Sequence, residues 1–338
     1  MPADIRTVES AEVDSGALAE LEQHRRELTG YCYRMLGSIF EAEDAVQETM
    51  IRAWRGIGNF EGRSAVRTWL HRIATNVCLD MLRGRQRRAL PIGLVPRYDE
   101  VSALGPMLPE SRWVMPVPDS RVLPDTADPA ELAASRETIH LAFVAALQYL
   151  PARQRAVLIL REVLGWSAAE VAVLLDTTVA SVTSALQRAR STMAVRDTAV
   201  APRRLDDAVE RELLAGYVDA FERYDVARLT ALLHNDATQS MAPYPLWVQG
   251  PGAIGRWMLG PGIKCRCSRL VPTEANGRPA LAQYRTDGLG GHVPFAVHIL
   301  GIDGTLVREI HTFVVPELFT AFGLPSALAA MDPLPIGR

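Results

Sequence analysis

The sequence of 338 residues lacks any run of 18 apolar residues, and its first 30 residues carry acids from Glu9 to Glu27. A helix that crosses a membrane needs about 20 apolar residues in a row, and a secretory signal peptide needs an apolar core near its start. We therefore expect a cytoplasmic protein without a membrane partner. The sequence also lacks a glycine-rich phosphate loop and an aspartate-rich metal motif, so we do not expect an enzyme that transfers phosphoryl groups.

Cysteine is scarce as well, with only four residues. Cys32 and Cys78 each stand alone in an apolar helical pattern, which is typical of reduced thiols. Cys265 and Cys267 would share one face of a strand, but no second pair of Cys or His residues completes a zinc set. The sequence therefore predicts no metal site and no cofactor.

Lysine is nearly absent: Lys264 is the only one, so arginine supplies almost all of the positive charge. Between residues 60 and 88, seven arginines stand against two acids, which gives a net charge of +5. Residues 89–134 hold seven acids, three arginines and eight prolines, and they show almost no periodicity. This pattern indicates a nucleic-acid contact in one part of the chain, followed by an extended acidic linker.

Hydrophobic periodicity divides the chain into four segments. Apolar residues recur at helical spacing before and after the linker, whereas the last segment opens with two helices and continues with five strand-like runs. Helices followed by a curved antiparallel sheet predict an α+β domain. We thus expect a multidomain protein with two all-α domains, the second containing a helix-turn-helix, and one C-terminal α+β domain. The segments are 18–88, 89–134, 135–196 and 205–338.

Residues 41–54 predict an amphipathic helix. Small or apolar side chains from Ala42 to Trp54 recur at three- and four-residue spacing and form one stripe that should be buried. The opposite face is either simply solvated or a surface for a partner. That face carries Asp44, Gln47, Glu48 and Ile51.

The next helix, expected at 68–83, combines guanidinium, amide and aromatic side chains. Arginine binds phosphates, Asn can hydrogen-bond an exposed base edge, and an aromatic ring can stack on an unpaired base. Core packing of Trp69 and local helix hydrogen bonds of Asn76 are the alternatives. The candidate DNA contacts in and just before this helix are Phe60, Trp69, Arg72, Asn76 and Arg83.

Residues 167–190 predict a helix-turn-helix. Ser167 and Glu170 can form a capping box, and Thr178 can cap the second helix. The second helix would bury a stripe that begins at Val179. Gln and Arg read adenine and guanine edges in the major groove, although a helix pair of this kind is often only a packing unit. The exposed face of the second helix carries Ala180, Ser184, Gln187, Arg188 and Ser191.

In this order, these motifs resemble the extracytoplasmic-function RNA polymerase sigma factors of the sigma-70 family. The resemblance rests on EAEDAVQETMIRAW at 41–54, RTWLHRIATNVCLDMLR at 67–83, LPARQRAVLILR at 150–161 and SAAEVAVLLDTTVASVTSALQRAR at 167–190. It implies a region 2 domain that binds core polymerase and the −10 promoter element. It also implies a region 4 domain that binds the −35 element and the polymerase flap.

The resemblance assigns roles to single residues as well. The acidic face of 41–54 would bind a coiled coil of the largest polymerase subunit. The loop at 59–64, with Asn59 and Arg63, would read a flipped −10 base, and the helix after it would hold the melted strand. The exposed face of the second helix of the helix-turn-helix would read the −35 element. The resemblance implies no catalytic residue.

The last segment resembles the SnoaL-like cone of the nuclear-transport-factor type. The resemblance rests on LLAGYVDAFERYDVARLTALLHNDAT, VQGPGAIGRWM and GIDGTLVREIHTFVVPELFTAFGLP. A curved sheet wrapped by helices leaves a pocket, and in enzymes of that superfamily a carboxylate or His in the cone performs acid–base chemistry. The candidate pocket residues are Met241, Trp247, Trp257, Tyr284, His298, His311 and Phe313.

Few residues of this cone could carry chemistry. Asp287, Glu309, His298 and His311 are the acid–base candidates, and no triad or paired-carboxylate spacing is visible. A metal-binding facial triad could also be drawn from His292, His298, Glu309 and His311. Because alternate residues of a strand point to opposite faces, the sequence leaves open whether these side chains meet. We therefore expect a regulatory cone that takes the place of a separate anti-sigma factor and responds to a small-molecule ligand or a partner. A cone that binds nothing and serves as a brace is the alternative.

Two other functions fit parts of the sequence. A ligand-sensing regulator with one helix-turn-helix would bind duplex DNA without polymerase, but it leaves the acidic face and the basic helix without a role. A SnoaL-like enzyme with a DNA-binding appendage would turn over a substrate with residues 205–338 alone.

Overall fold

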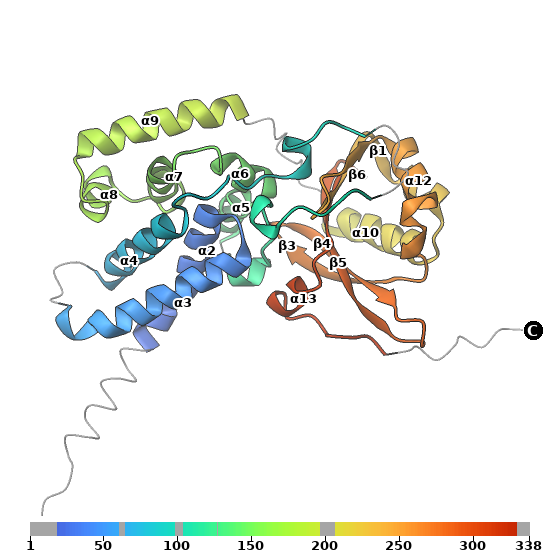
Figure 1. Cartoon of the computed structure of the whole chain (residues 1–338), viewed down its shortest axis with the longest axis horizontal. Helices are drawn as coiled ribbons and strands as arrows, with labels where there is room; N and C mark the ends of the chain where they lie inside the picture. Colours follow the sequence, from blue (N-terminus) through green and yellow to red (C-terminus); the bar gives the residue numbers. More distant parts are fainter. Residues whose placement is uncertain (1–18, 61–64, 99–103, 127, 197–206, 330–338) are drawn as a thin grey trace, which may run out of the picture. The chain divides into compact units, whose positions relative to one another are not determined.

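The computed structural model of the chain describes residues 19–60, 65–98, 104–126, 128–196 and 207–329, and Figure 1 labels its elements. Arg63 lies outside the described residues, and so does the side chain of Asn59. The chain folds as two compact units, and each is built from two separate stretches of sequence. The first unit comprises 1–87 and 120–198, and the second comprises 88–119 and 199–338.

The first unit begins with three helices that pack on one another, α2 (Arg25–Leu36), α3 (Ile39–Gly56) and α4 (Val66–Met81). Most of the predicted stripe of α3 is buried, but Trp54 is 36% exposed. At about 100° per residue, Trp54 lies about 120° around the helix from Ala42, outside the packed face. The buried stripe therefore ends at Ala53 and not at Trp54 as expected.

The second stretch of the first unit forms the expected helix-turn-helix. The capping box is confirmed, because the Ser167 hydroxyl accepts from the Glu170 amide at 3.2 Å and the Glu170 carboxylate accepts from the Ser167 amide at 2.7 Å. Val179 is 49% exposed rather than buried, because it is the first residue of its helix; the packed stripe begins at Val182. The helices are α5 (Pro129–Glu137), α6 (Leu141–Leu147), α7 (Ala152–Leu158), which continues as the π-helix η5 (Ile159–Val163), α8 (Ala168–Leu174) and α9 (Val179–Arg196).

No single helix among the described residues is long and apolar enough to cross a membrane. The helices α8 and α9 reach that length and apolarity only when they are taken together, and the chain bends by 103° between them.

Buried arginines join the two helical stretches of the first unit. Arg155 of α7 is 5% exposed and donates to the carbonyl oxygen of Met35 and to Gln148 Oε1. Arg34 of α2 donates to Thr138 Oγ1 at 2.6 Å. Hydrogen bonds from charged donors are stronger than those between neutral groups, so these contacts stabilise the packing of α2 against the later helices.

The second unit contains a six-stranded sheet with the strand order β2-β1-β6-β5-β4-β3. The strands β1 and β6 pair in parallel and all other neighbours pair antiparallel, so the expected purely antiparallel sheet is corrected at this one pair. The three-residue strand β2 was not expected. The strands are β1 (Leu233–Ala242), β2 (Trp247–Gln249), β3 (Arg269–Ala275), β4 (Arg278–Thr286), β5 (His292–Asp303) and β6 (Leu306–Phe313).

Helices cover one face of this sheet and complete the α+β cone. Tyr217 of α10 and Leu229 of α11 join a buried cluster with Leu281 and Ile310 of the sheet. A helix that the sequence did not predict, α12, contributes Trp257 to the same cluster; its start at Pro251 follows Gly250, and this pair of residues is typical of a turn. The helices are α10 (Asp207–Glu222), α11 (Val226–Ala231), α12 (Pro251–Leu259) and the short α13 (Leu318–Ala321).

Residues 88–98 and 104–119 belong to the second unit, so this part of the linker expected at 89–134 is not an extended spacer. Val117 exchanges two hydrogen bonds with Asn276, one with its backbone amide and one with its side-chain oxygen, both at 3.0 Å. The Leu108 amide donates to the carbonyl oxygen of Pro243. Proline prevents regular elements but not burial, and the apolar residues between the prolines pack. Those buried to 1% exposure or less are Trp113, Val114, Met115 and Val117.

Candidate functional sites

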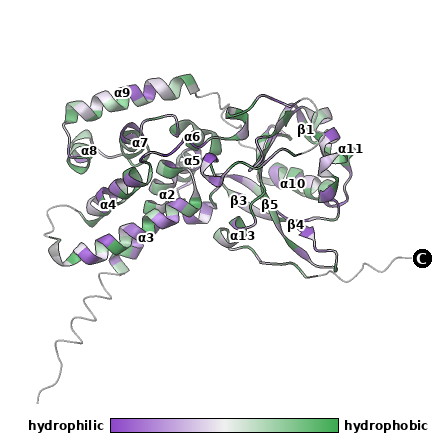
Figure 2. Ribbon diagram, viewed as in Figure 1, coloured by the Kyte–Doolittle hydropathy of each residue, from purple (hydrophilic) through white to green (hydrophobic). Residues whose placement is uncertain are grey.

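The predicted polymerase-binding face of α3 is accessible. Asp44, Gln47 and Ile51 are exposed, and Glu48 is half-buried. These positions recur at three- and four-residue spacing, so they lie on one side of the helix. Figure 2 shows hydrophilic and hydrophobic residues side by side along α3, as an amphipathic helix requires. The Glu48 carboxylate accepts from Arg52 Nε at 2.7 Å, and this exposed pair holds the acidic side chain along the helix.

Side chains that suit single-stranded DNA lie along α4. Arg72 and Asn76 are exposed, and so is Arg83, which lies after the last residue of the helix, Met81, and not within it as expected. Trp69 is half-buried, and its ring lies 4.9 Å from the ring of Phe60, with 33° between the planes. The structure therefore brings together two aromatic rings, while the exposed guanidinium and amide groups follow on the same helix. Such a surface can hold phosphates and an unstacked base.

The predicted DNA-reading face of α9 is exposed along its length. Ala180, Ser184, Gln187, Arg188 and Ser191 are all exposed. The Thr178 hydroxyl accepts from the Ser181 amide at 3.1 Å and so caps the start of this helix. An exposed helix with small residues at its start and Gln and Arg one turn later fits the major groove.

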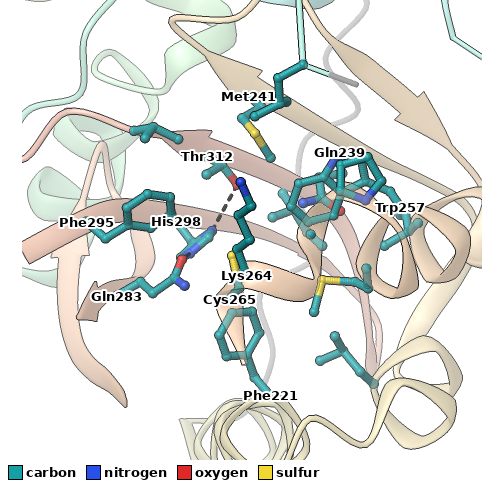
Figure 3. A pocket seen from close by; sticks show the side chains of 18 of the residues that line it. Phe221, Gln239, Met241, Trp257, Lys264, Cys265, Gln283, Phe295, His298 and Thr312 are labelled. Carbon is teal, nitrogen blue, oxygen red and sulfur yellow. Dashed lines mark hydrogen bonds between the residues drawn. The ribbon is translucent and has the colours of Figure 1, made fainter. Parts of the chain in front are cut away.

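The second unit encloses a cavity of about 230 Å³ between the sheet and the helices α10 and α12. Figure 3 shows a chain of polar side chains on the sheet side of this cavity. His298 Nδ1 lies 2.9 Å from Thr312 Oγ1, and His298 Nε2 lies 2.9 Å from Gln283 Oε1. The Gln283 amide nitrogen in turn donates to Ser268 Oγ at 2.9 Å. Because an amide oxygen only accepts, His298 carries its proton on Nε2 and accepts from the Thr312 hydroxyl at Nδ1.

His298 is a structural histidine in this arrangement. Burial lowers its pKa from 6.5 to about 4, so the ring is neutral near pH 7. Both ring nitrogens already have hydrogen-bond partners, so neither is free to take a proton from a substrate. The described lining of the cavity contains no carboxylate.

Three of the seven predicted pocket residues line the cavity, namely Met241, Trp257 and His298. The other four do not, and this corrects the prediction for them. Successive side chains of a strand point to opposite faces, so Tyr284, His311 and Phe313 lie behind the lining residues Gln283, Thr312 and Val314. Trp247 instead donates from Nε1 to the carbonyl oxygen of Val95, which belongs to the stretch 88–119 of the same unit. Lining residues that the sequence did not reveal include Gln239, Lys264, Gln283, Arg285, Phe295 and Thr312.

The remaining acid–base candidates are engaged outside the cavity. His311 Nδ1 lies 3.0 Å from Ser240 Oγ, and Arg278 donates to Glu309 Oε2 at 2.6 Å. His311 makes the largest contribution, with Arg278, to lowering the pKa of Glu309 to about 2, although burial opposes this. Asp287 accepts from two backbone amides of its own hairpin loop. Within the described residues, no three His, Cys, Asp or Glu side chains lie close enough to hold a metal ion.

Comparisons with known proteins identify the two helical stretches. The family described as Sigma-70 region 2 matches residues 21–88, and the family described as Sigma-70, region 4 matches residues 140–193. The crystal structure of the Mycobacterium tuberculosis extracytoplasmic function sigma factor SigJ has a similar fold. It aligns with a TM-score of 0.55 and 23% identity, over 94% of this chain and all of that chain.

Sequence relatives extend the match to the second unit. The chain is 46% identical over 314 residues to the ECF RNA polymerase sigma factor SigG of Mycobacterium tuberculosis (strain CDC 1551 / Oshkosh), which covers 92% of this chain and 84% of that protein. It is 33% identical over 168 residues to the RNA polymerase sigma-H factor of Pseudomonas aeruginosa, which covers 50% of this chain and 79% of that protein.

Two sigma-70 regions in this order define a sigma factor of the sigma-70 class. The chain belongs to the extracytoplasmic-function RNA polymerase sigma factors, because its similarity to SigG runs through both regions and into the cone. The resemblance inferred from the motifs is thereby confirmed, as is the fold class of two helical sigma domains followed by an α+β cone.

Proposed function

We propose that this protein is an alternative sigma factor that binds core RNA polymerase, recognises a promoter and helps to melt it. The observation that carries this proposal is the exposure of three helix faces in the order that the family uses. These faces lie on α3, α4 and α9. A regulator that only binds duplex DNA has no need of the first two.

Each face has a proposed partner. The acidic face of α3 would bind a coiled coil of the largest polymerase subunit, with Ile51 as its apolar centre. Trp69, Arg72 and Asn76 of α4 would hold the melted −10 strand, and α9 would read the −35 element. The same domain, whose lead-in helices include residues 150–161, would also contact the polymerase flap.

The cone would modulate the sigma regions through residues 88–119. This stretch connects the two regions along the chain, yet it packs in the second unit together with the cone. Asn276 has a positive φ of 55° and is fully buried, and it accepts from Val117 through its side chain. A change in the conformation of the cone would thus alter residues 88–119, which connect the two sigma regions. The cone would in this way take the place of a separate anti-sigma factor.

Initiation assays test the sigma activity. Full-length protein with core polymerase should start transcripts from members of a promoter library, and core polymerase alone should not. Binding of duplex promoter DNA without polymerase should be weak. Failure to initiate from any promoter, combined with tight duplex binding by the protein alone, would support the helix-turn-helix regulator instead.

A single substitution tests the modulation. Asn276→Gly removes the side-chain acceptor for Val117 and keeps a residue that adopts positive φ without strain. Asn235→Gly is the matched control, because Asn235 is exposed and lies on β1 of the cone. A higher initiation rate for Asn276→Gly than for the control identifies an inhibitory cone, and a lower rate identifies a positioning cone. Equal rates would remove this route of modulation.

A further inference from the structure

We propose that the cone cavity binds a small apolar carboxylic acid that also carries a hydroxyl group. The carboxylate would lie at Lys264 and the hydroxyl between Gln239 and Trp257. This proposal rests on the role of the cone as a regulatory module and names the class of molecule that it takes.

The shape and lining of the cavity favour an apolar body. Phe221, Leu229, Met258 and Ile310 contribute apolar surface from both helices and sheet. Thr312, His298 and Gln283 hydrogen-bond one another, and Gln283 also bonds Ser268, so these polar groups need no hydrogen bond from a ligand. An apolar ligand gains most of its binding free energy from such a lining, and a few polar groups fix its orientation.

Two residues of the cavity lining each carry a buried polar atom that has no hydrogen-bond partner among the described residues. Gln239 is 7% exposed and Trp257 is 6% exposed, and neither Gln239 Oε1 nor Trp257 Nε1 has a hydrogen bond. The first can only accept and the second can only donate. They lie on β1 and α12, which pack against each other, and Figure 3 shows both side chains on the same side of the cavity. A hydroxyl group donates and accepts at once, so it matches this pair.

The position of Trp257 depends on a glycine. A Cβ atom at Gly262 would come within 2.7 Å of the Trp257 ring and within 2.9 Å of its carbonyl oxygen. Gly262 itself lines the cavity. The absence of a side chain here therefore leaves room for the indole of Trp257 beside the cavity.

The charges around the cavity favour an anion. Lys264 and Arg285 are the charged residues of the described lining, and both are cationic. Arg285 lies over the ring of Phe295, with 4.5 Å from the guanidinium carbon to the ring centroid. Lys264 makes no ion pair with a described residue, and Figure 3 shows its side chain extending across the cavity. Because no described acid neutralises this ammonium group, a carboxylate is the group that it would select.

Three related probes separate the two polar contacts. Hydroxynaphthoic acid carries both groups, naphthoic acid lacks the hydroxyl, and naphthol lacks the carboxylate. Calorimetry with the full-length protein should rank hydroxynaphthoic acid first. Equal affinity for the three probes, or no binding of any, would overturn the proposal.

Variants of two residues complete the test. Lys264→Met should weaken both acids about tenfold and leave naphthol unchanged, because a hydrogen bond to a charged group is lost. Gln239→Leu should weaken hydroxynaphthoic acid and naphthol about threefold and leave naphthoic acid unchanged. Arg266→Met and Gln249→Leu are the matched controls, because neither residue lines the cavity. Thermal unfolding verifies that each variant is folded, and losses that are equal for all probes would contradict the assigned contacts.

Initiation assays with hydroxynaphthoic acid distinguish this proposal from the one on which it rests. Binding that leaves initiation unchanged would overturn the modulatory role of the cone and keep the ligand class. If no probe binds while Asn276→Gly still alters initiation, the modulatory role stands and the ligand class is wrong.

Discussion

The candidate functional side chains are exposed in the helical unit and buried in the cone. In the helical unit the candidate side chains are exposed on helix faces, as at Asp44 and Arg188. In the cone they are buried around a cavity, as at Gln239 and His298. Exposed side chains can bind a macromolecule, whose own groups become their partners, whereas side chains around a cavity can bind only a molecule small enough to enter it. Substitutions should therefore change assembly in the first unit and stability or ligand binding in the second.

The largest expected effect is on polymerase binding. Asp44→Arg together with Glu48→Arg reverses two charges on the exposed face of α3, where no core packing is lost. We expect holoenzyme formation to fall below detection in gel filtration, while the melting temperature falls only slightly, because the Glu48–Arg52 pair that is lost lies at the surface. Glu212→Arg with Asp236→Arg makes the same change in charge at exposed sites of the cone and should preserve binding. Normal holoenzyme formation by the α3 variant would remove this face as the docking site.

The second effect is on the pH dependence of stability. His298 has a pKa of about 4 in the folded cone and about 6.5 when unfolded, so the unfolded chain binds more protons between these values. Its contribution of about 3 kcal/mol to the free energy of unfolding is present above pH 6.5 and is lost as the pH falls through 4. His298→Gln should flatten this part of the profile, measured by denaturant unfolding.

A histidine in the helical unit provides the comparison. Burial also lowers the pKa of His71, so His71→Gln should flatten the same side of the profile. If His298→Gln kept the full slope of the natural protein, the neutral buried state assigned to His298 would be wrong.

The third effect is on promoter choice. Arg188→Ala should cost about 1–3 kcal/mol at the base pair that it reads, or about 5- to 150-fold in −35-dependent initiation, and it should relax the preference there. Arg190→Ala is the control, because Arg190 pairs with Glu162 at 2.5 Å within the protein. Initiation from a library randomised at the −35 element measures both. An unchanged preference would count against α9 as the reading helix.

The smallest effect is expected at Trp54 of the helical unit, and a buried tryptophan of the second unit serves as its reference. Trp54 is 36% exposed, so Trp54→Ala should cost only about 1 kcal/mol of stability. Trp113 is 1% exposed, and Trp113→Ala should cost about 3–5 kcal/mol, the range for a buried tryptophan. Urea unfolding of the two variants gives both values. Equal losses would contradict the different burial of these side chains.

Local sequence patterns predicted the helical unit well. The helix-turn-helix followed from capping residues and from spacing, both of which act within one or two turns. Val179 and Trp54 were predicted to be buried, but each lies at the end of its apolar stripe, where no neighbouring element covers it. Periodicity defines a face of a helix, but the neighbours decide how much of that face is covered.

The cone was predicted as a fold but not in its detail. The parallel pairing of β1 with β6 joins strands about seventy residues apart, and nothing within either strand encodes that partner. Alternate residues of a strand point to opposite faces of the sheet, and the sequence does not show which of the two sets faces the cavity. His311 and Phe313 were therefore predicted as lining residues, whereas their neighbour Thr312 lines the cavity. The stretch 88–119 was misread because its prolines suggested a spacer, while the burial of Trp113 depends on residues far away in the sequence.

The course of the chain makes the second unit tolerant of a break. The chain enters this unit at Arg88, leaves it at Asp119 and returns at Ala199. A protease that cut between residues 198 and 199 would yield two fragments that remain associated, since Val117 and Asp119 would still hydrogen-bond Asn276 and Gly277. The nicked protein would migrate as one species under native conditions and as two in denaturant. Proteolysis alone would therefore not release the cone from the sigma regions; release would require unfolding of the second unit.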